Sequence, residues 1–126
     1  MDKENKLVPG LPSGFEDRWS NKLLLKKKLV KAIEKNFIKF GAEALETPSF
    51  EISENIGSFL AEDDTNPMSG VFSFEDGEKN ITLRYDLSSP LARFVAQNNQ
   101  ELPSIFKRYQ IQNVFRNEKA GNGRYR

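Results

Sequence analysis

The sequence of 126 residues contains neither cysteine nor histidine. Without cysteine there are no disulfide bonds and no thiolate metal ligands. Without histidine the chain lacks the most common general base, the usual zinc ligand and every serine–histidine or cysteine–histidine nucleophile. If the chain belongs to an enzyme, its residues therefore act by positioning the substrates and by electrostatic stabilisation.

Long apolar runs and a strong excess of one charge are also missing. No stretch approaches the roughly 20 apolar residues that a membrane-spanning helix needs, and residues 1–6 lack the apolar centre of a signal peptide. We therefore expect a cytoplasmic protein without a membrane segment. The 19 basic and 18 acidic residues give a net charge of +1, so any attraction to a polyanion has to come from local patches.

The clearest periodic pattern predicts a helix over residues 16–40. Ser13 or Asp17 is expected to cap its start, and Gly41 is expected to end it. Lysines fall on the opposite side from the apolar stripe, and we interpret them as a solvated face rather than a nucleic-acid surface. The stripe itself has three-, four- and seven-residue spacing and consists of Trp19, Leu23, Val30, Ile33, Phe37 and Phe40, and it is widened by Leu25 and Leu29.

The rest of the chain predicts short elements separated by turn residues. Strands joined by tight turns, with helices packed on them, define an α+β fold with an antiparallel sheet. The expected elements are a strand over 42–50 interrupted by Pro48, a helix over 53–60 capped by Ser53, a hairpin of 71–74 and 80–84 around Asp76-Gly77, a helix over 87–98, and a long strand over 104–116.

The segment at residues 106–126 is the richest in candidate chemistry. A strand pattern leads to Arg116 and Glu118, and a glycine-rich loop then carries Arg124 and Arg126. Residues two apart on a strand share a face, so Arg116 and Glu118 are expected to point the same way. The planar fork of arginine fits phosphate or carboxylate, so the segment suits a polyanion with the edge of a base. An exposed hairpin tip with ordinary surface charge is an equally open interpretation.

A second candidate lies where a predicted strand gives way to a helix. Asp86 is suited to binding an ammonium group, and Ser88 is suited to adding a hydrogen bond. Capping of the following helix by either side chain is the more frequent role for such residues, and it stays open here. The acidic residues 62–64 lack the oxygen-ligand spacing of a calcium or magnesium site, so we expect no metal site in the chain.

Taken in order, these segments resemble class II aminoacyl-tRNA synthetases, and histidyl-tRNA synthetases among them. The resemblance extends from about residue 8 to the end of the chain. It is carried most specifically by Leu-Arg-Tyr-Asp-Leu at residues 83–87 and Gly-Arg-Tyr-Arg at residues 123–126. The chain then corresponds to the N-terminal part of the catalytic domain, with motif 1 at about 20–51, the histidine-recognition segment at about 82–93, and an incomplete motif 2 at about 104–126.

The resemblance implies a role for each candidate residue. Arg116, the implied catalytic residue, contacts both the α-phosphate of ATP and the histidine carboxylate. The family often has glutamate where Asp86 stands, and aspartate keeps the same charge. The implied sets are Asp86, Leu87, Ser88 and Arg116 for histidine, Arg116, Glu118 and Arg124 for ATP, and Lys119, Asn122 and Arg126 for the acceptor end of the tRNA.

The resemblance also implies partners and an activity. ATP is a substrate that carries Mg²⁺ with it, the other substrates are histidine and the histidine tRNA, and the motif 1 region forms a homodimer. Family members run to several hundred residues, and motif 3, the residues that recognise the imidazole and the anticodon-binding domain lie beyond residue 126. We therefore expect this chain to lack useful ligase activity alone.

Two alternatives belong to other functional classes. The family includes a catalytically silent, histidine-sensing regulatory subunit of ATP phosphoribosyltransferase. The presence of Arg116, Glu118 and Arg124 favours the ligase, because a regulatory protein need not keep the ATP contacts. A free-standing interaction module is disfavoured, since the unfinished hairpin of motif 2 leaves a strand edge open to pairing.

Overall fold

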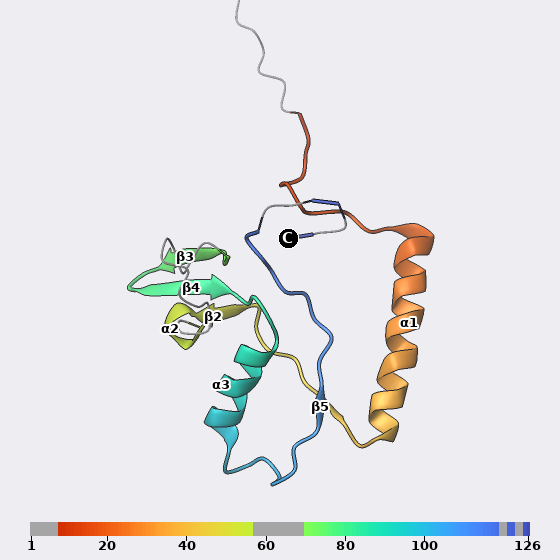
Figure 1. Ribbon diagram of the computed structural model, residues 1–126, viewed down its shortest axis with the longest axis vertical. Helices are drawn as coiled ribbons and strands as arrows, with labels where there is room; N and C mark the ends of the chain where they lie inside the picture. Colours follow the sequence, from red (N-terminus) through yellow and green to blue (C-terminus); the bar gives the residue numbers. More distant parts are fainter. Residues whose placement is uncertain (1–7, 57–69, 119–120, 123–124) are drawn as a thin grey trace, which may run out of the picture.

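The computed structural model describes residues 8–56, 70–118, 121–122 and 125–126. Figure 1 shows a long helix on one side, a small sheet with two short helices on the other, and the segment that carries β5 running between them. The expected α+β class with an antiparallel sheet is confirmed. The elements are α1 (Ser20–Lys39), β1 (Glu43–Ala44), β2 (Phe50–Ile52), α2 (Ser53–Ile56), β3 (Ser73–Asp76), β4 (Lys79–Leu83), α3 (Ser88–Asn98) and β5 (Arg108–Tyr109).

The three-stranded sheet has the order β2-β4-β3, and both of its pairings are antiparallel. The predicted hairpin is confirmed, with Asp76 opposite Lys79 across a two-residue turn. Gly77 in that turn has φ 62°, a conformation that costs glycine little because it has no Cβ. The interruption expected at Pro48 is also confirmed, since β1 ends before it and β2 begins after it.

The long strand predicted over residues 104–116 is wrong. Only Arg108–Tyr109 forms a ladder, and it pairs in parallel with β1. A strand is as long as its pairing allows, and within the described residues only the two-residue β1 pairs with this segment. Further along, the extended chain makes single backbone bonds instead, from Phe115 N to Arg84 O at 2.9 Å and from Asn117 N to Gly70 O at 3.0 Å.

Helix α1 starts later than predicted. Its N-cap is Trp19, which makes no side-chain capping bond, so the predicted caps are wrong. Gly41 follows the helix end as predicted, with φ 76° and a bond from its N–H to Ile38 O at 3.0 Å. The apolar stripe of α1 is present, but no residue of the helix is buried. Leu25, for example, is 70% exposed.

The other predicted helices are found at the expected places. Helix α3 covers Ser88–Asn98, within one residue of the prediction. Helix α2 covers Ser53–Ile56, and the rest of that predicted helix lies outside the described residues. The Ser53 hydroxyl is bonded to Thr82 Oγ1 of β4 at 2.5 Å, so it fastens α2 to the sheet.

The buried part of the molecule is small and unusually polar. Ile56, Val71 and Pro90 are the buried apolar residues among those described, while Thr47, Glu51, Thr82 and Arg84 are the buried polar or charged ones. Buried polar groups are stable only when they are hydrogen-bonded. The bonds of these groups therefore decide how the segments around the candidate site are held. No helix in the described part of the chain has the length and hydrophobicity to cross a membrane.

Candidate functional site

Arg84 holds three segments of the chain together from a position only 3% exposed. Its Nε donates to Asn113 O at 2.6 Å, and its Nη1 donates to Thr47 O at 2.7 Å and to Gln112 Oε1 at 3.2 Å. We call Thr47, Arg84, Gln110, Gln112 and Asn113 the polar junction. Burial lowers the pKa of Arg84, with Glu46 and Glu51 opposing that effect.

Two glutamines complete the polar junction. Gln112 Oε1 accepts from Thr47 N at 3.0 Å, and Gln112 Nε2 donates to Thr47 O at 3.2 Å. Gln110 Nε2 donates to Thr47 Oγ1 at 2.8 Å and to Gln112 Oε1 at 2.6 Å. These bonds fix residues 110–113, which lead directly into the strand segment that carries Arg116.

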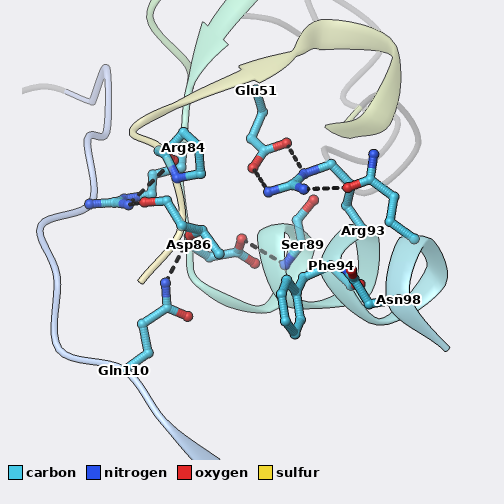
Figure 2. A network of polar contacts seen from close by, with 11 residues as sticks. Glu51, Arg84, Asp86, Ser89, Arg93, Phe94, Asn98 and Gln110 are labelled. Carbon is cyan, nitrogen blue, oxygen red and sulfur yellow. Dashed lines mark hydrogen bonds and ion pairs between the residues drawn. The ribbon is translucent and has the colours of Figure 1, made fainter. Parts of the chain in front are cut away.

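A forked ion pair fastens α3 to β2. Arg93 of α3 donates from Nε to Glu51 Oε2 at 2.6 Å and from Nη2 to Glu51 Oε1 at 2.9 Å, as the dashed lines of Figure 2 show. A third donor, Nη1, bonds Gln97 at 2.8 Å. The Glu51 side chain is only 4% exposed, so this pair is largely shielded from water. It sets where the start of α3 lies relative to the sheet.

Asp86 stands at that start. Its Oδ1 accepts a hydrogen bond from Ser89 N at 3.2 Å, visible in Figure 2. Asp86 therefore makes one capping hydrogen bond to the first turn of α3. The contact does not exclude ligand binding, because an ionised carboxylate has about four acceptor positions. Asp86 and Ser88 also line an open hollow of about 450 Å³ on the exposed side of α3, together with Asn55, Ser89, Ala92, Arg93, Ala96 and Gln97.

Arg116 and Glu118 meet at the side chain of Tyr85. The Arg116 guanidinium lies over the Tyr85 ring, 4.5 Å from its centroid, and Arg116 Nε is 3.5 Å from Tyr85 O. The Tyr85 hydroxyl donates to Glu118 Oε1 at 2.9 Å. That bond raises the pKa of Tyr85, as does partial burial, while the positive charge of Arg116 works in the opposite direction. The structure thus brings together the two charged residues that the strand pattern placed on one face.

Arg126 is turned inward. Its guanidinium lies 5.0 Å from the centroid of the Phe72 ring and is hydrogen-bonded to Asn117 Oδ1. Its backbone N–H donates to Gly14 O at 2.8 Å, so it also ties the segment before α1 to the end of the motif 2 segment. A hollow of about 470 Å³ lies between residues 14–18 and residues 113–115.

The remaining candidates are separate from these contacts or outside the described residues. Leu87 is half-buried, at the N-cap position of α3, and Asn122 is exposed in a turn. Lys119 and Arg124 lie outside the described residues, as do the acidic residues 62–64. Within the described ranges, no group of three or more acidic, histidine or cysteine side chains is arranged to hold a metal ion.

Sequence reasoning missed Tyr85 and Arg84 as individual residues of the site. Both are in the Leu-Arg-Tyr-Asp-Leu segment, in which the sequence assigned roles only to Asp86 and Leu87. The sequence held a signal for Arg84, which directly follows an apolar strand. An arginine in such a place is a candidate for burial, and a buried arginine needs hydrogen-bond partners. For Tyr85, strand alternation places it on the opposite face from Arg84, but nothing local indicates that this face meets residues 116–118.

Comparisons with known proteins identify the class. No family model matches the chain. Its fold matches part of the crystal structure of histidyl-tRNA synthetase from Nostoc sp. PCC 7120, with a TM-score of 0.74 and 26% identity, over 86% of this chain and 25% of that one. A structure described as an ATP phosphoribosyltransferase regulatory subunit/histidyl-tRNA synthetase from Bacillus halodurans C matches with a TM-score of 0.76 over 90% of this chain and 29% of that one. At 23% identity, the second match shows the fold alone. The described architecture is thus part of a class II aminoacyl-tRNA synthetase core.

Sequence relatives narrow the resemblance further. The chain is 81% identical to the histidine–tRNA ligase of Pelagibacter ubique over all 126 residues, which are 27% of that protein. It is 43% identical to the histidine–tRNA ligase of Rhodopseudomonas palustris (strain BisB18) over 98% of this chain and 24% of that protein. The resemblance to histidyl-tRNA synthetases is therefore confirmed along the whole chain, which spans about a quarter of the length of these relatives.

Proposed function

We propose that the chain supplies part of the ATP and histidine sites of a histidine–tRNA ligase. In this reaction ATP and histidine give histidyl-adenylate and pyrophosphate, and the histidyl group then passes to the tRNA. The observation that supports the proposal is that Arg116 and Glu118 both contact Tyr85, the residue that precedes Asp86 in the chain. A guanidinium suited to phosphate and a carboxylate suited to an ammonium group are what joining a nucleotide to an amino acid requires.

Arg116 is the catalytic residue of the proposal. Its guanidinium edge binds the α-phosphate and the histidine carboxylate, where negative charge accumulates as the carboxylate attacks phosphorus. Asp86 binds the α-ammonium of histidine with the oxygen that does not accept from Ser89, and Ser88 and Leu87 line the same pocket. None of these steps needs a protein base, which agrees with the absence of histidine.

Glu118 and Arg124 complete the ATP contacts, at the adenine and at the γ-phosphate. Lys119 and Asn122 approach the acceptor end of the tRNA, and Arg126 supports that loop through its bond to Asn117. Mg²⁺ arrives bound to the ATP phosphates, whose charge it neutralises, and no cluster of acidic side chains for it is present among the described residues.

The location and assembly are part of the same proposal. The protein acts in the cytoplasm as a homodimer formed through residues 20–51. The largely exposed apolar stripe of α1 supports such an association, because a stripe of this kind is usually covered.

Pyrophosphate exchange tests the activity. The full-length product of the gene is incubated with ATP and labelled pyrophosphate, and each amino acid is supplied in turn. We expect exchange with histidine only, and then transfer of histidine to tRNA. Exchange with another amino acid, or none with a folded protein, contradicts the proposal. Histidine binding without exchange would favour the regulatory alternative.

A chimera tests the contribution of these 126 residues. They replace the matching segment of the Pelagibacter ubique ligase, to which they are 81% identical. The chimera is expected to keep exchange activity, and Arg116→Ala in the chimera is expected to lower it about a thousandfold, since donors to transition-state charge are worth about 10²–10³ in rate. Arg108→Ala is the matched control and is expected to leave the rate within about threefold, because Arg108 belongs to β5 rather than to the group of Arg116, Glu118 and Tyr85.

A further inference from the structure

Tyr85 contacts both charged residues that the proposed function places against ATP. Its ring lies under the Arg116 guanidinium at 4.5 Å, and its hydroxyl donates to Glu118 Oε1 at 2.9 Å. One half-buried side chain therefore sets the position of two exposed ones.

The stack on Tyr85 leaves the edge of the Arg116 guanidinium pointing away from the ring. A guanidinium that lies on an aromatic ring uses its flat face, and its N–H donors point outward in the plane of the group. Those in-plane donors are the ones that bind phosphate or carboxylate in a fork. Tyr85 thus orients Arg116 with its ring and engages only the Nε donor through its backbone oxygen, which leaves the two Nη groups for a substrate.

The ring of Tyr85 lies close to Gly70. A Cβ added to Gly70 would be in ordinary van der Waals contact with Tyr85 Cε2, at 3.8 Å. Backbone bonds fasten the chain on both sides, from Asn117 N to Gly70 O and from Phe115 N to Arg84 O. The backbone that carries Tyr85 is therefore anchored close to the segment that carries Arg116 and Glu118.

Tyr85 also lies where Arg116 and Glu118 would otherwise meet. The two residues are opposite in charge and two apart on an extended segment, which places them on one face. They form no ion pair with each other in the structure, in which both are described. The arginine packs on the ring of Tyr85 and the glutamate bonds its hydroxyl. If the tyrosine were removed, a direct Arg116–Glu118 pair would compete with ATP for both groups.

We propose that Tyr85 is a positioning residue for ATP: it holds Arg116 and Glu118 apart, and it presents the edge of the guanidinium to the phosphates. The inference rests on the proposed function, since it takes ATP as the ligand of both residues.

The protonation state of Tyr85 supports this role. Its raised pKa keeps the hydroxyl protonated, and so able to donate to Glu118, throughout the neutral range. A pKa that is raised on folding adds stability below the pKa of the unfolded tyrosine, and that stability is lost as the pH rises through the folded value. The hold on Glu118 is thus complete near neutral pH and fails only in alkali.

The first experiment measures ATP binding by calorimetry in the full-length gene product. Tyr85→Leu removes both the ring and the hydroxyl, and we expect ATP to bind about tenfold more weakly, the loss of a cation–π contact and a hydrogen bond. Tyr85→Phe keeps the ring and loses only the hydroxyl, so a smaller loss of about threefold is expected. Tyr109→Leu is the control, because it removes a ring that stacks on Phe37 instead, and it should leave ATP binding unchanged.

The second experiment is a double-mutant cycle between residues 85 and 118. A merely structural role for Tyr85 would give the same loss of ATP binding with or without Glu118. Glutamine cannot form an ion pair with Arg116, so Tyr85→Leu should weaken ATP binding much less in a Glu118→Gln background than in the parent. Equal losses in the two backgrounds would overturn the inference. So would a loss in Tyr109→Leu that matches the loss in Tyr85→Leu. If Tyr85→Leu does not fold, Tyr85→Phe takes its place in the cycle.

These experiments separate the inference from the proposed function. ATP binding that depends on Tyr85 as described, without histidine-dependent exchange, supports the inference and contradicts the ligase. Exchange with histidine that is indifferent to Tyr85 supports the ligase and overturns the inference. A parent protein that does not bind ATP contradicts both.

Discussion

The polar junction around Arg84 and the apolar stripe of α1 reverse the usual relation between polarity and burial. Arg84 is charged and only 3% exposed, whereas Leu25 is apolar and 70% exposed. The junction is stable inside because most of its donors and acceptors are bonded to one another, although Gln110 Oε1 is buried without a partner among the described residues. The stripe gains less from folding, because the described part of the chain leaves most of its side chains exposed. In this molecule, hydrogen bonds rather than apolar contacts hold the segments around the site.

The comparison has a consequence for the site. The junction fixes residues 110–113, and Arg84 O accepts from Phe115 N, so Arg116 follows directly from a segment anchored on both sides. Helix α1, by contrast, stacks Phe37 on Tyr109 of β5, just before that segment, with 5.7 Å between ring centroids. Changes in the junction should therefore affect the whole fold, and changes in the stripe should affect little in this chain.

The largest effect is expected from Arg84→Met. The substitution keeps much of the side-chain volume but leaves the carbonyls of Thr47 and Asn113 without their charged donor. Loss of a charged hydrogen-bonding group in a buried position costs about 3 kcal/mol. Urea unfolding followed by circular dichroism should show that loss or an unfolded chain. Arg116→Met is the matched control and should cost less than about 1 kcal/mol, since Arg116 is exposed. Equal costs at the two arginines would break the comparison.

A smaller but clear effect is expected from the ion pair between β2 and α3. Glu51→Ala leaves the Arg93 fork without its carboxylate in a place where Glu51 is only 5% exposed. We expect a loss of about 2 kcal/mol in the free energy of unfolding. Arg93→Ala in the Glu51→Ala background should add little, because the two changes remove the same interaction. Additive losses would show that the pair contributes nothing of its own.

Local patterns in the sequence predicted the elements on which this comparison depends, but not the comparison itself. The periodicity of α1, the turn at Gly77 and the proline-led start of α3 each lie within a few residues, and each element was found. The junction joins residues far apart in the chain, with separations of 37 residues from Thr47 to Arg84, 28 from Arg84 to Gln112 and 65 from Thr47 to Gln112. No periodic pattern records such contacts.

The difference between local and long-range contacts also separates the wrong predictions at the site from the correct ones. The long strand over 104–116 was predicted from its residues, yet strand formation depends on a partner, and β1 offers only two residues. The common face of Arg116 and Glu118 was predictable, because alternation along an extended chain is local. The meeting of that face with Tyr85, 33 residues away from Glu118, was not.

The aromatic stack is the place where the stripe and the site segment meet, so it sharpens the comparison. Phe37→Ala should cost about 1 kcal/mol, the value of an aromatic pair together with partial burial. The chemical shifts of the Tyr109 ring protons in an NMR spectrum would report loss of the stack directly. Phe40→Ala is the control, since Phe40 is 79% exposed and forms no aromatic pair with another described residue. A cost at Phe40 equal to that at Phe37 would contradict the assignment of this contact.

The smallest effect is expected from Leu25→Ala, in the exposed stripe. In the 126-residue chain the free energy of unfolding should change by less than about 0.5 kcal/mol, because the side chain has little contact to lose and alanine favours a helix. In the full-length gene product the same substitution should cost about 2 kcal/mol or more, if residues 20–51 form the proposed dimer. Sedimentation and thermal unfolding of both proteins would measure the difference. An equally small effect in the two proteins would show that the stripe stays exposed, and it would remove the main support for the dimer.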